Sequence, residues 1–190
     1  MVMFKTQERT GFTLIEMLVV ISVTLILSAI LIGYSREAGK QLLLVNNQAK
    51  LVSLISRAKS LSIVTFIENT ALPSSPSDPK VCGYGVHVEK GTGEVSIFRD
   101  LAIDCANSDN KFGSGDVKLT GQLNVFQLNS QATQFASDTT LRDVIFIPPD
   151  PTTIINGDVS TKEAAISIEV KDGSSKSTVK INNAGRISTK

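Results

Sequence analysis

The chain has 190 residues, of which 42% are hydrophobic and 19% charged, and its formal net charge is +1. This size and composition suit one membrane helix followed by one modest globular domain, and they give no sign of a second domain. The near-zero charge also excludes an electrostatic footprint for nucleic acid at the level of the whole chain.

The first element is a short polar leader containing Lys5 and Arg9, which ends at Gly11 and runs directly into an apolar segment. From Phe12 to Ile32 the one ionisable side chain is Glu16. At about 1.5 Å per residue, a helix of this length reaches the thickness of the hydrocarbon core of a bilayer. A carboxylate at membrane depth costs about 3 kcal/mol on insertion scales, so we expect Glu16 to be functional and to have a partner.

The order of leader, glycine, phenylalanine, Thr-Leu-Ile and glutamate resembles the N-terminus of type IV pilins and type II secretion pseudopilins. The resemblance implies that a prepilin peptidase cuts between Gly11 and Phe12 and that the new terminal residue, Phe12, is N-methylated. The cationic amine of Phe12 would then pair with the Glu16 carboxylate of the same or a neighbouring subunit, so that Glu16 directs subunit assembly. Cleavage would leave equal numbers of basic and acidic side chains.

The resemblance also implies the partners. They are other pilin or pseudopilin subunits, the prepilin peptidase/methyltransferase, and the bacterial inner (cytoplasmic) membrane, which the unassembled subunit crosses once with its globular domain periplasmic or extracellular. The alternative is an ordinary secretory signal peptide or signal anchor, which predicts a small-residue cleavage site after the apolar run. The sequence Ser28-Ala29-Ile30 is a poor version of that site.

A single long helix is predicted beyond the leader, because no proline occurs between Phe12 and Pro73. We expect about fifty to sixty helical residues, apolar all round at first and amphipathic later, with the outer half against a sheet. Gly33 replaces the proline that pilins often carry near this position and weakens the helix by about 1 kcal/mol relative to alanine. Apolar residues recur at helical spacing in the outer half, at Leu44, Leu51, Leu54, Ile55, Ala58 and Leu61.

Strand signals follow a segment with three prolines. Val81 to Lys90 and Glu94 to Ile103 are strand-like runs, and the glycines of Lys90 to Gly93 suit a tight hairpin turn. Later strands are predicted at Val117 to Leu128 and Arg142 to Ile147. A last hairpin is predicted from Ala164 to Lys171 and from Lys176 to Ile181.

The cysteines, Cys82 and Cys105, both follow the predicted membrane span. Outside the cytoplasm a disulfide is the default expectation for such a pair, with two free buried thiols as the alternative. The predicted hairpin places Cys82 opposite roughly Leu101, so a disulfide would clip its open end and contribute about 3 kcal/mol. The chain has one histidine and no Cys-x-x-Cys pair, so a metal site is not favoured.

The predicted fold class is therefore α+β: a long N-terminal helix with a membrane-embedded first half, packed on a C-terminal antiparallel β domain. The expected divisions are a cleaved leader at 1–11, a transmembrane and filament-core helix at 12–33, and its amphipathic continuation at 34–70. A Pro/Ser-rich linker follows at 71–80, and the β domain occupies 81–190.

The order of the later elements resembles the minor pseudopilin H and FimT-like family, which implies a pilin-like domain of two packed β-sheets against the helix. Some FimT-like proteins that serve DNA uptake carry Gly-Arg-x-Arg near the C-terminus. This chain has Gly185 and Arg186, but Ser188 stands where the second arginine would be. Arg186 is thus a candidate for weak DNA contact only, and DNA is not an expected partner.

Catalytic signals are absent. His87 lies in a strand pattern, where a packed or surface histidine is favoured over a general base, and the sequence has no Gly-x-Ser-x-Gly elbow or P-loop. Four aspartates, Asp138, Asp143, Asp150 and Asp158, fall in or beside turns, where a structural role is favoured over calcium ligation.

We therefore predict a structural subunit rather than an enzyme, with no catalytic residue, metal or cofactor. The predicted protein is a minor pilin or pseudopilin of a type II secretion pseudopilus or type IV pilus. A DNA-uptake minor pilin and a surface adhesin subunit stay open as alternatives. The shared N-terminus does not distinguish among a secretion system, a pilus and a competence machine, nor does it distinguish a tip from a shaft position.

Overall fold

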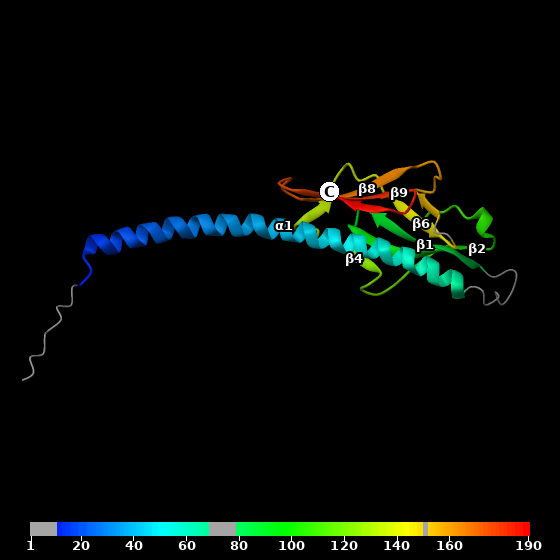
Figure 1. Cartoon of the computed structure of the whole chain (residues 1–190), viewed down its shortest axis with the longest axis horizontal. Coiled ribbons are helices and arrows are strands. Elements are labelled where there is room, and N and C mark those ends of the chain that lie inside the picture. The colour runs from blue at the N-terminus through cyan, green and yellow to red at the C-terminus, as the bar shows by residue number, and fades with distance from the viewer. Residues whose placement is uncertain (1–10, 69–78, 150–151) are drawn as a thin grey trace, which may run out of the picture. The chain divides into compact units, whose positions relative to one another are not determined.

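The computed structural model describes residues 11–68, 79–149 and 152–190 (Figure 1). The chain divides into two compact units, residues 1–40 and residues 41–190, and helix α1 (Leu14–Glu68) contributes to both. The leader positions Lys5 and Arg9 lie outside the described residues, as do Pro73, Pro76 and Asp150.

Helix α1 is uninterrupted over 55 residues and passes through Gly33, which confirms the prediction of a single long helix. In the first unit its large apolar side chains are all exposed, from Leu14 to Ile32. By length and composition, α1 is the one helix among the described residues that could cross a membrane. In the second unit one stripe of α1 is buried instead, with Leu51, Ile55 and Ala58 completely inaccessible.

The β strands form two antiparallel sheets, so the predicted α+β class with a two-sheet β domain is confirmed. The first sheet has the order β3-β2-β1-β6-β7, with β4 also paired to β2. Its strands are β1 (Lys80–Glu89), β2 (Glu94–Ala102), β3 (Val117–Lys118), β4 (Val125–Gln127), β6 (Asp143–Ile147) and β7 (Thr152–Ile155).

The second sheet has the order β10-β9-β8-β5. Its strands are β5 (Thr133–Phe135), β8 (Glu163–Val170), β9 (Lys176–Asn182) and β10 (Ile187–Thr189). Both sheets and the outer half of α1 contribute side chains to one apolar core, including Val86 of β1, Ile166 of β8 and Leu51 of α1. The buried Ser62 hydroxyl also donates to the Phe146 carbonyl oxygen at 2.7 Å and so ties α1 to β6.

The predicted strand from Val117 to Leu128 is wrong as a single element. The structure has two short strands there, β3 and β4, both paired with β2. Between them Gly121 adopts φ +100°, and the Asn124 amide nitrogen of the backbone donates to the Gly121 carbonyl at 2.9 Å. A positive φ is available to glycine without steric cost, so this residue turns the chain where the apolar pattern alone continues.

The hairpin of β1 and β2 has the predicted turn, and its register pairs Val81 with Leu101. The register shifts between Val81 and Gly83, so Cys82 occupies a bulge. Three short strands, β5, β7 and β10, were not predicted, and each has only three or four residues.

We expect Gly85→Ala to lower the free energy of unfolding by about 1–3 kcal/mol through overpacking. A methyl group at Gly85 would overlap the ring of Phe98 and lie 2.7 Å from the Val144 carbonyl oxygen. Urea unfolding of the full chain in detergent would measure the change. Gly91→Ala is the matched control, because its new methyl group would meet no atom closer than 3.8 Å; equal stabilities of the two variants would contradict the prediction.

Candidate functional site

The segment at the start of α1 contains a reciprocal capping arrangement between Thr13 and Glu16. The Thr13 backbone N–H and hydroxyl each donate to Glu16 Oε2 at 2.8 Å, and the Glu16 N–H donates to the Thr13 hydroxyl at 3.3 Å. This is the capping box of the Thr-x-x-Glu pattern, which satisfies donors that a helix N-terminus leaves unpaired. Gly11, Phe12 and Thr13 precede the first helical residue.

The cap leaves part of the Glu16 carboxylate available. Both bonds from Thr13 go to Oε2, and among the described residues no partner is recorded for Oε1. The next charged side chain along the helix is Arg36. Gly11, Phe12 and Glu16 were predicted as functional residues, whereas the capping role of Thr13 was not, although the spacing of Thr13 and Glu16 is itself a signal for a capping box.

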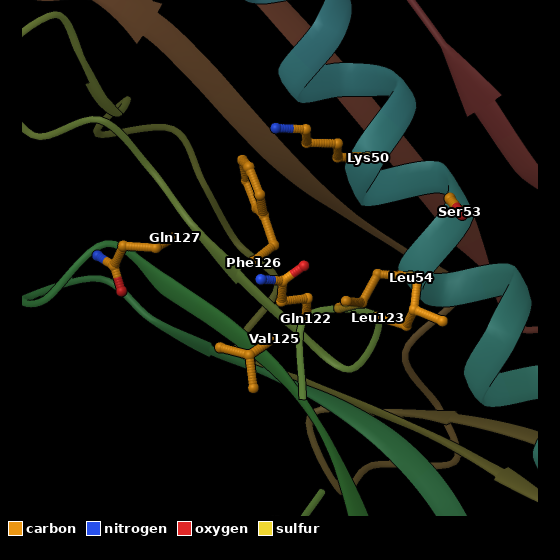
Figure 2. Close-up of a pocket in the computed structure, with 8 residues that line it drawn as sticks. All are labelled: Lys50, Ser53, Leu54, Gln122, Leu123, Val125, Phe126 and Gln127. Atoms are coloured by element: carbon orange, nitrogen blue, oxygen red, sulfur yellow. The ribbon is translucent and has the colours of Figure 1, made fainter. Parts of the chain in front are cut away.

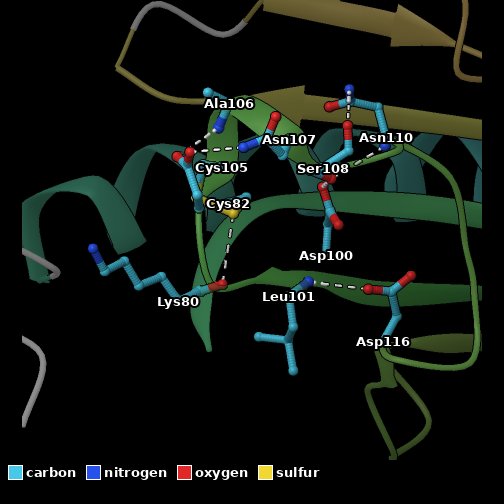
Figure 3. The surroundings of a disulfide bond; sticks show 11 residues. Lys80, Cys82, Asp100, Leu101, Cys105, Ala106, Asn107, Ser108, Asn110 and Asp116 are labelled. Carbon is cyan, nitrogen blue, oxygen red and sulfur yellow. Dashed lines mark hydrogen bonds between the residues drawn. A yellow bond between two sulfur atoms is a disulfide. The ribbon is translucent and has the colours of Figure 1, made fainter. Parts of the chain in front are cut away.

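A disulfide joins Cys82 of β1 to Cys105 of the short 3-10 helix η1 (Cys105–Asn107), with 5.2 Å between the Cα atoms (Figure 3). The Asp104 carboxylate caps η1 by accepting from the Ala106 N–H at 3.1 Å. Asp116 closes the same loop, because its Oδ1 accepts from the Leu101 N–H at 3.0 Å.

Asp100 of β2 lies beneath this loop and is buried. Burial raises the pKa of its carboxyl group, the nearby carboxylates of Asp116 and Asp109 raise the pKa further, and a hydrogen bond from the Ser108 hydroxyl opposes this shift. A raised pKa in the folded state means that folding favours the protonated acid.

We therefore expect Asp100 to stabilise the fold at acidic pH and to lose that contribution as pH rises from about 4 through its raised folded pKa. Asp100→Asn cannot ionise, so its stability relative to wild type should increase over the same interval. Thermal unfolding of both proteins at several pH values would measure this difference. A difference that is constant with pH would contradict the prediction.

A buried pair that the sequence analysis did not connect lies across β1 and β6. His87 Nδ1 is 2.7 Å from Asp143 Oδ1, and both side chains are buried. The other ring nitrogen, Nε2, is 3.5 Å from Glu89 Oε2. Nucleophilic catalysis of the Ser–His–Asp or Cys–His type places a hydroxyl or thiol against that second nitrogen, whereas among the described residues the group that faces it is the Glu89 carboxylate.

Two further candidate aspartates, Asp138 and Asp158, have hydrogen-bond partners. Asp138 accepts from Lys176 Nζ at 2.7 Å. Asp158 accepts from the Ser160 N–H and hydroxyl, both at 2.8 Å. Among the residues with a described placement, no three His, Cys, Asp or Glu side chains converge as a metal site.

Arg186 is exposed in the turn between β9 and β10, where its backbone N–H donates to Asn182 Oδ1 at 2.9 Å. Lysines of the neighbouring strand β9 are matched by carboxylates. Lys180 Nζ lies 2.7 Å from Glu163 Oε1, in addition to the pair of Lys176 with Asp138. The structure therefore does not gather a cluster of unpaired cations from β9 around Arg186.

An open groove of about 390 Å³ lies between the outer half of α1 and the β3–β4 connection (Figure 2). Lys50 is its one charged lining residue, and its Nζ lies 5.9 Å from the centre of the Phe126 ring. The groove is lined by Lys50, Ser53, Leu54, Gln122, Leu123, Val125, Phe126 and Gln127. It offers no histidine, cysteine or carboxylate for acid–base chemistry.

The fold and the N-terminal segment together define an α+β protein with an apolar N-terminal helix suited to membrane anchoring. Residues 8–32 match the family model of the prokaryotic N-terminal methylation motif. The match supports a type IV pilin-like precursor, processed by prepilin peptidase and assembled with other pilins. Comparison with curated proteins and with solved structures returns no match.

Proposed function

We propose that this chain is a minor pilin or pseudopilin of the pseudopilin H and FimT-like type, a structural subunit of a type II secretion pseudopilus or type IV pilus. The observation that carries the proposal is the methylation motif at residues 8–32, which contains Gly11, Phe12 and Glu16. In this proposal the peptide bond after Gly11 is cut and the new amine of Phe12 is methylated.

The geometry at the start of α1 supports an assembly role for Glu16. Thr13 holds one carboxylate oxygen by two hydrogen bonds, and the second oxygen can accept the cationic amine of Phe12 from another subunit. A hydrogen bond between two charged groups is about twice as strong as a neutral one, and the apolar surroundings of α1 strengthen it. Each incoming subunit would thereby be fixed at one axial position.

A structural role also agrees with the class of protein that carries this motif, which is not enzymatic. In the proposed pathway the precursor crosses the inner membrane once, with its β domain outside the cytoplasm. The disulfide between Cys82 and Cys105 suits an oxidising compartment.

Intact-mass measurement of the protein from cells with and without prepilin peptidase tests the proposal. We expect loss of residues 1–11 and gain of one methyl group on Phe12, both dependent on the peptidase. Gly11→Val is the control, because a bulky side chain at the cleavage position should leave the precursor uncut. An uncut wild-type chain, or a cut after Ala29, would contradict the proposal and favour a signal anchor or a signal peptide.

A further inference from the structure

The connection between β2 and β3, residues 103–116, covers the face of the first sheet that points away from the main core. We call these residues the β2–β3 loop. Phe98 and Ile145 are completely buried yet lie outside the main apolar cluster, as expected for the opposite face. The loop places Phe112 there, with its ring centre 5.4 Å from that of Phe98.

Under this loop lies a row of three polar side chains on neighbouring strands. The register pairs His87 of β1 with Ser96 of β2 on one side and with Asp143 of β6 on the other. All three side chains are buried, and the Phe112 ring lies 4.7 Å from the His87 ring. The charged groups that face His87 are Asp143 and Glu89.

Covering this row carries a penalty. Among the residues that the structure describes, the Ser96 hydroxyl has no hydrogen-bond partner although it is completely buried. A buried polar group without a partner destabilises the state that buries it. The β2–β3 loop is attached to the first sheet at three places.

These attachments lie near both ends of the loop and in its middle. Near β3, Asp116 accepts from the Leu101 N–H, and in the middle the Ser108 hydroxyl donates to Asp100. Near β2, the attachment is covalent, because the disulfide ties Cys105 to Cys82 (Figure 3). A cavity of about 370 Å³ borders Phe112 and Asp143, so the covered row already lies next to an opening.

We propose that the β2–β3 loop is a redox-latched cover over the Ser96–His87–Asp143 row, closed when the disulfide forms and open a larger fraction of the time when it is reduced. When the loop closes, the thiols of Cys82 and Cys105 together lose two electrons and two protons and form the disulfide bond. The oxidant is the disulfide of another protein, which accepts the two electrons and two protons and becomes two thiols. Oxidation after export would thus complete the outer face of the β domain.

The chain has one histidine, so the accessibility of His87 can be read directly. The probe is diethyl pyrocarbonate, which modifies accessible imidazole, applied to the full chain in detergent. We expect the reduced and alkylated protein to react at least about tenfold faster than the oxidised protein, because local opening of the β2–β3 loop exposes the His87 ring. Equal rates would overturn the proposal.

Two variants and a second measurement separate opening of the cover from unfolding. Phe112→Ala should accelerate the reaction with the disulfide intact, whereas Leu123→Ala, at an exposed apolar residue of another loop, should not. In the reduced protein the amide hydrogens of β8 and β9 should keep a higher free energy of opening than His87, because these core strands open only when the whole domain unfolds. If His87 reactivity and exchange in these strands report the same free energy of opening, reduction exposes His87 only by unfolding the domain, and the cover proposal fails.

Discussion

Replacing Glu16 with alanine is expected to reduce incorporation into filaments by about ten- to hundredfold, the equivalent of the 1.5–3 kcal/mol of a hydrogen bond to a charged group. Membrane insertion and cleavage after Gly11 should stay at the wild-type level, because the apolar helix and the scissile bond are unchanged. The measurement is the ratio of the subunit in sheared filaments to that in membranes.

Glu16→Gln separates the charge of Glu16 from its role in the cap. The glutamine oxygen can still accept from the Thr13 N–H and hydroxyl, as Glu16 does at 2.8 Å, but it carries no charge for a partner's amine. We expect the glutamine variant to show the same reduction in incorporation as the alanine variant. Normal incorporation of the glutamine variant would assign the effect of alanine to the lost cap and contradict charge pairing between subunits.

Removal of the disulfide by the double substitution Cys82→Ser and Cys105→Ser should lower the free energy of unfolding by about 3 kcal/mol. The two cysteines are separated by 23 positions, and releasing a loop of this length increases the conformational freedom of the unfolded chain. Urea unfolding of the full chain in detergent measures the loss. The reduced wild-type protein is the control and should unfold at nearly the same midpoint.

The double variant also distinguishes a stabilising bond from a dispensable one. An unchanged midpoint would mean that Asp116 and the sheet contacts hold the β2–β3 loop without the covalent bond. A loss well above the expected value would instead show that the disulfide also holds packing contacts of Phe112 in place.

The elements with strong local signals could be predicted from the sequence. Helix α1 follows from a long proline-free apolar run, and the hairpin of β1 and β2 follows from two β runs around Gly91 and Gly93. Strands β5, β7 and β10 could not be predicted, because three or four residues are too few to show an alternating pattern. The pairing partner of β5 is also distant in sequence, whereas β7 and β10 pair with the strands just before them. The turn at Gly121 was not predicted, because the apolar pattern on either side of it looked like one continuous strand.

The candidate sites also divide into those that local sequence predicts and those that depend on strand pairing. Gly11, Phe12 and Glu16 lie within six residues of one another, so the cleavage motif and the lone carboxylate were readable from the sequence alone. His87 and Asp143 are separated by 56 positions. Their contact depends on the register of β1 with β6, which no local pattern encodes.

The sequence by itself determined the apolar helix, the methylation motif and the α+β class, because each depends on the order of neighbouring residues. Only the tertiary structure decided that Cys82 occupies a bulge within reach of Cys105 and that Phe112 covers His87. These contacts depend on side-chain direction and strand register, and register is set by the packing of the whole domain.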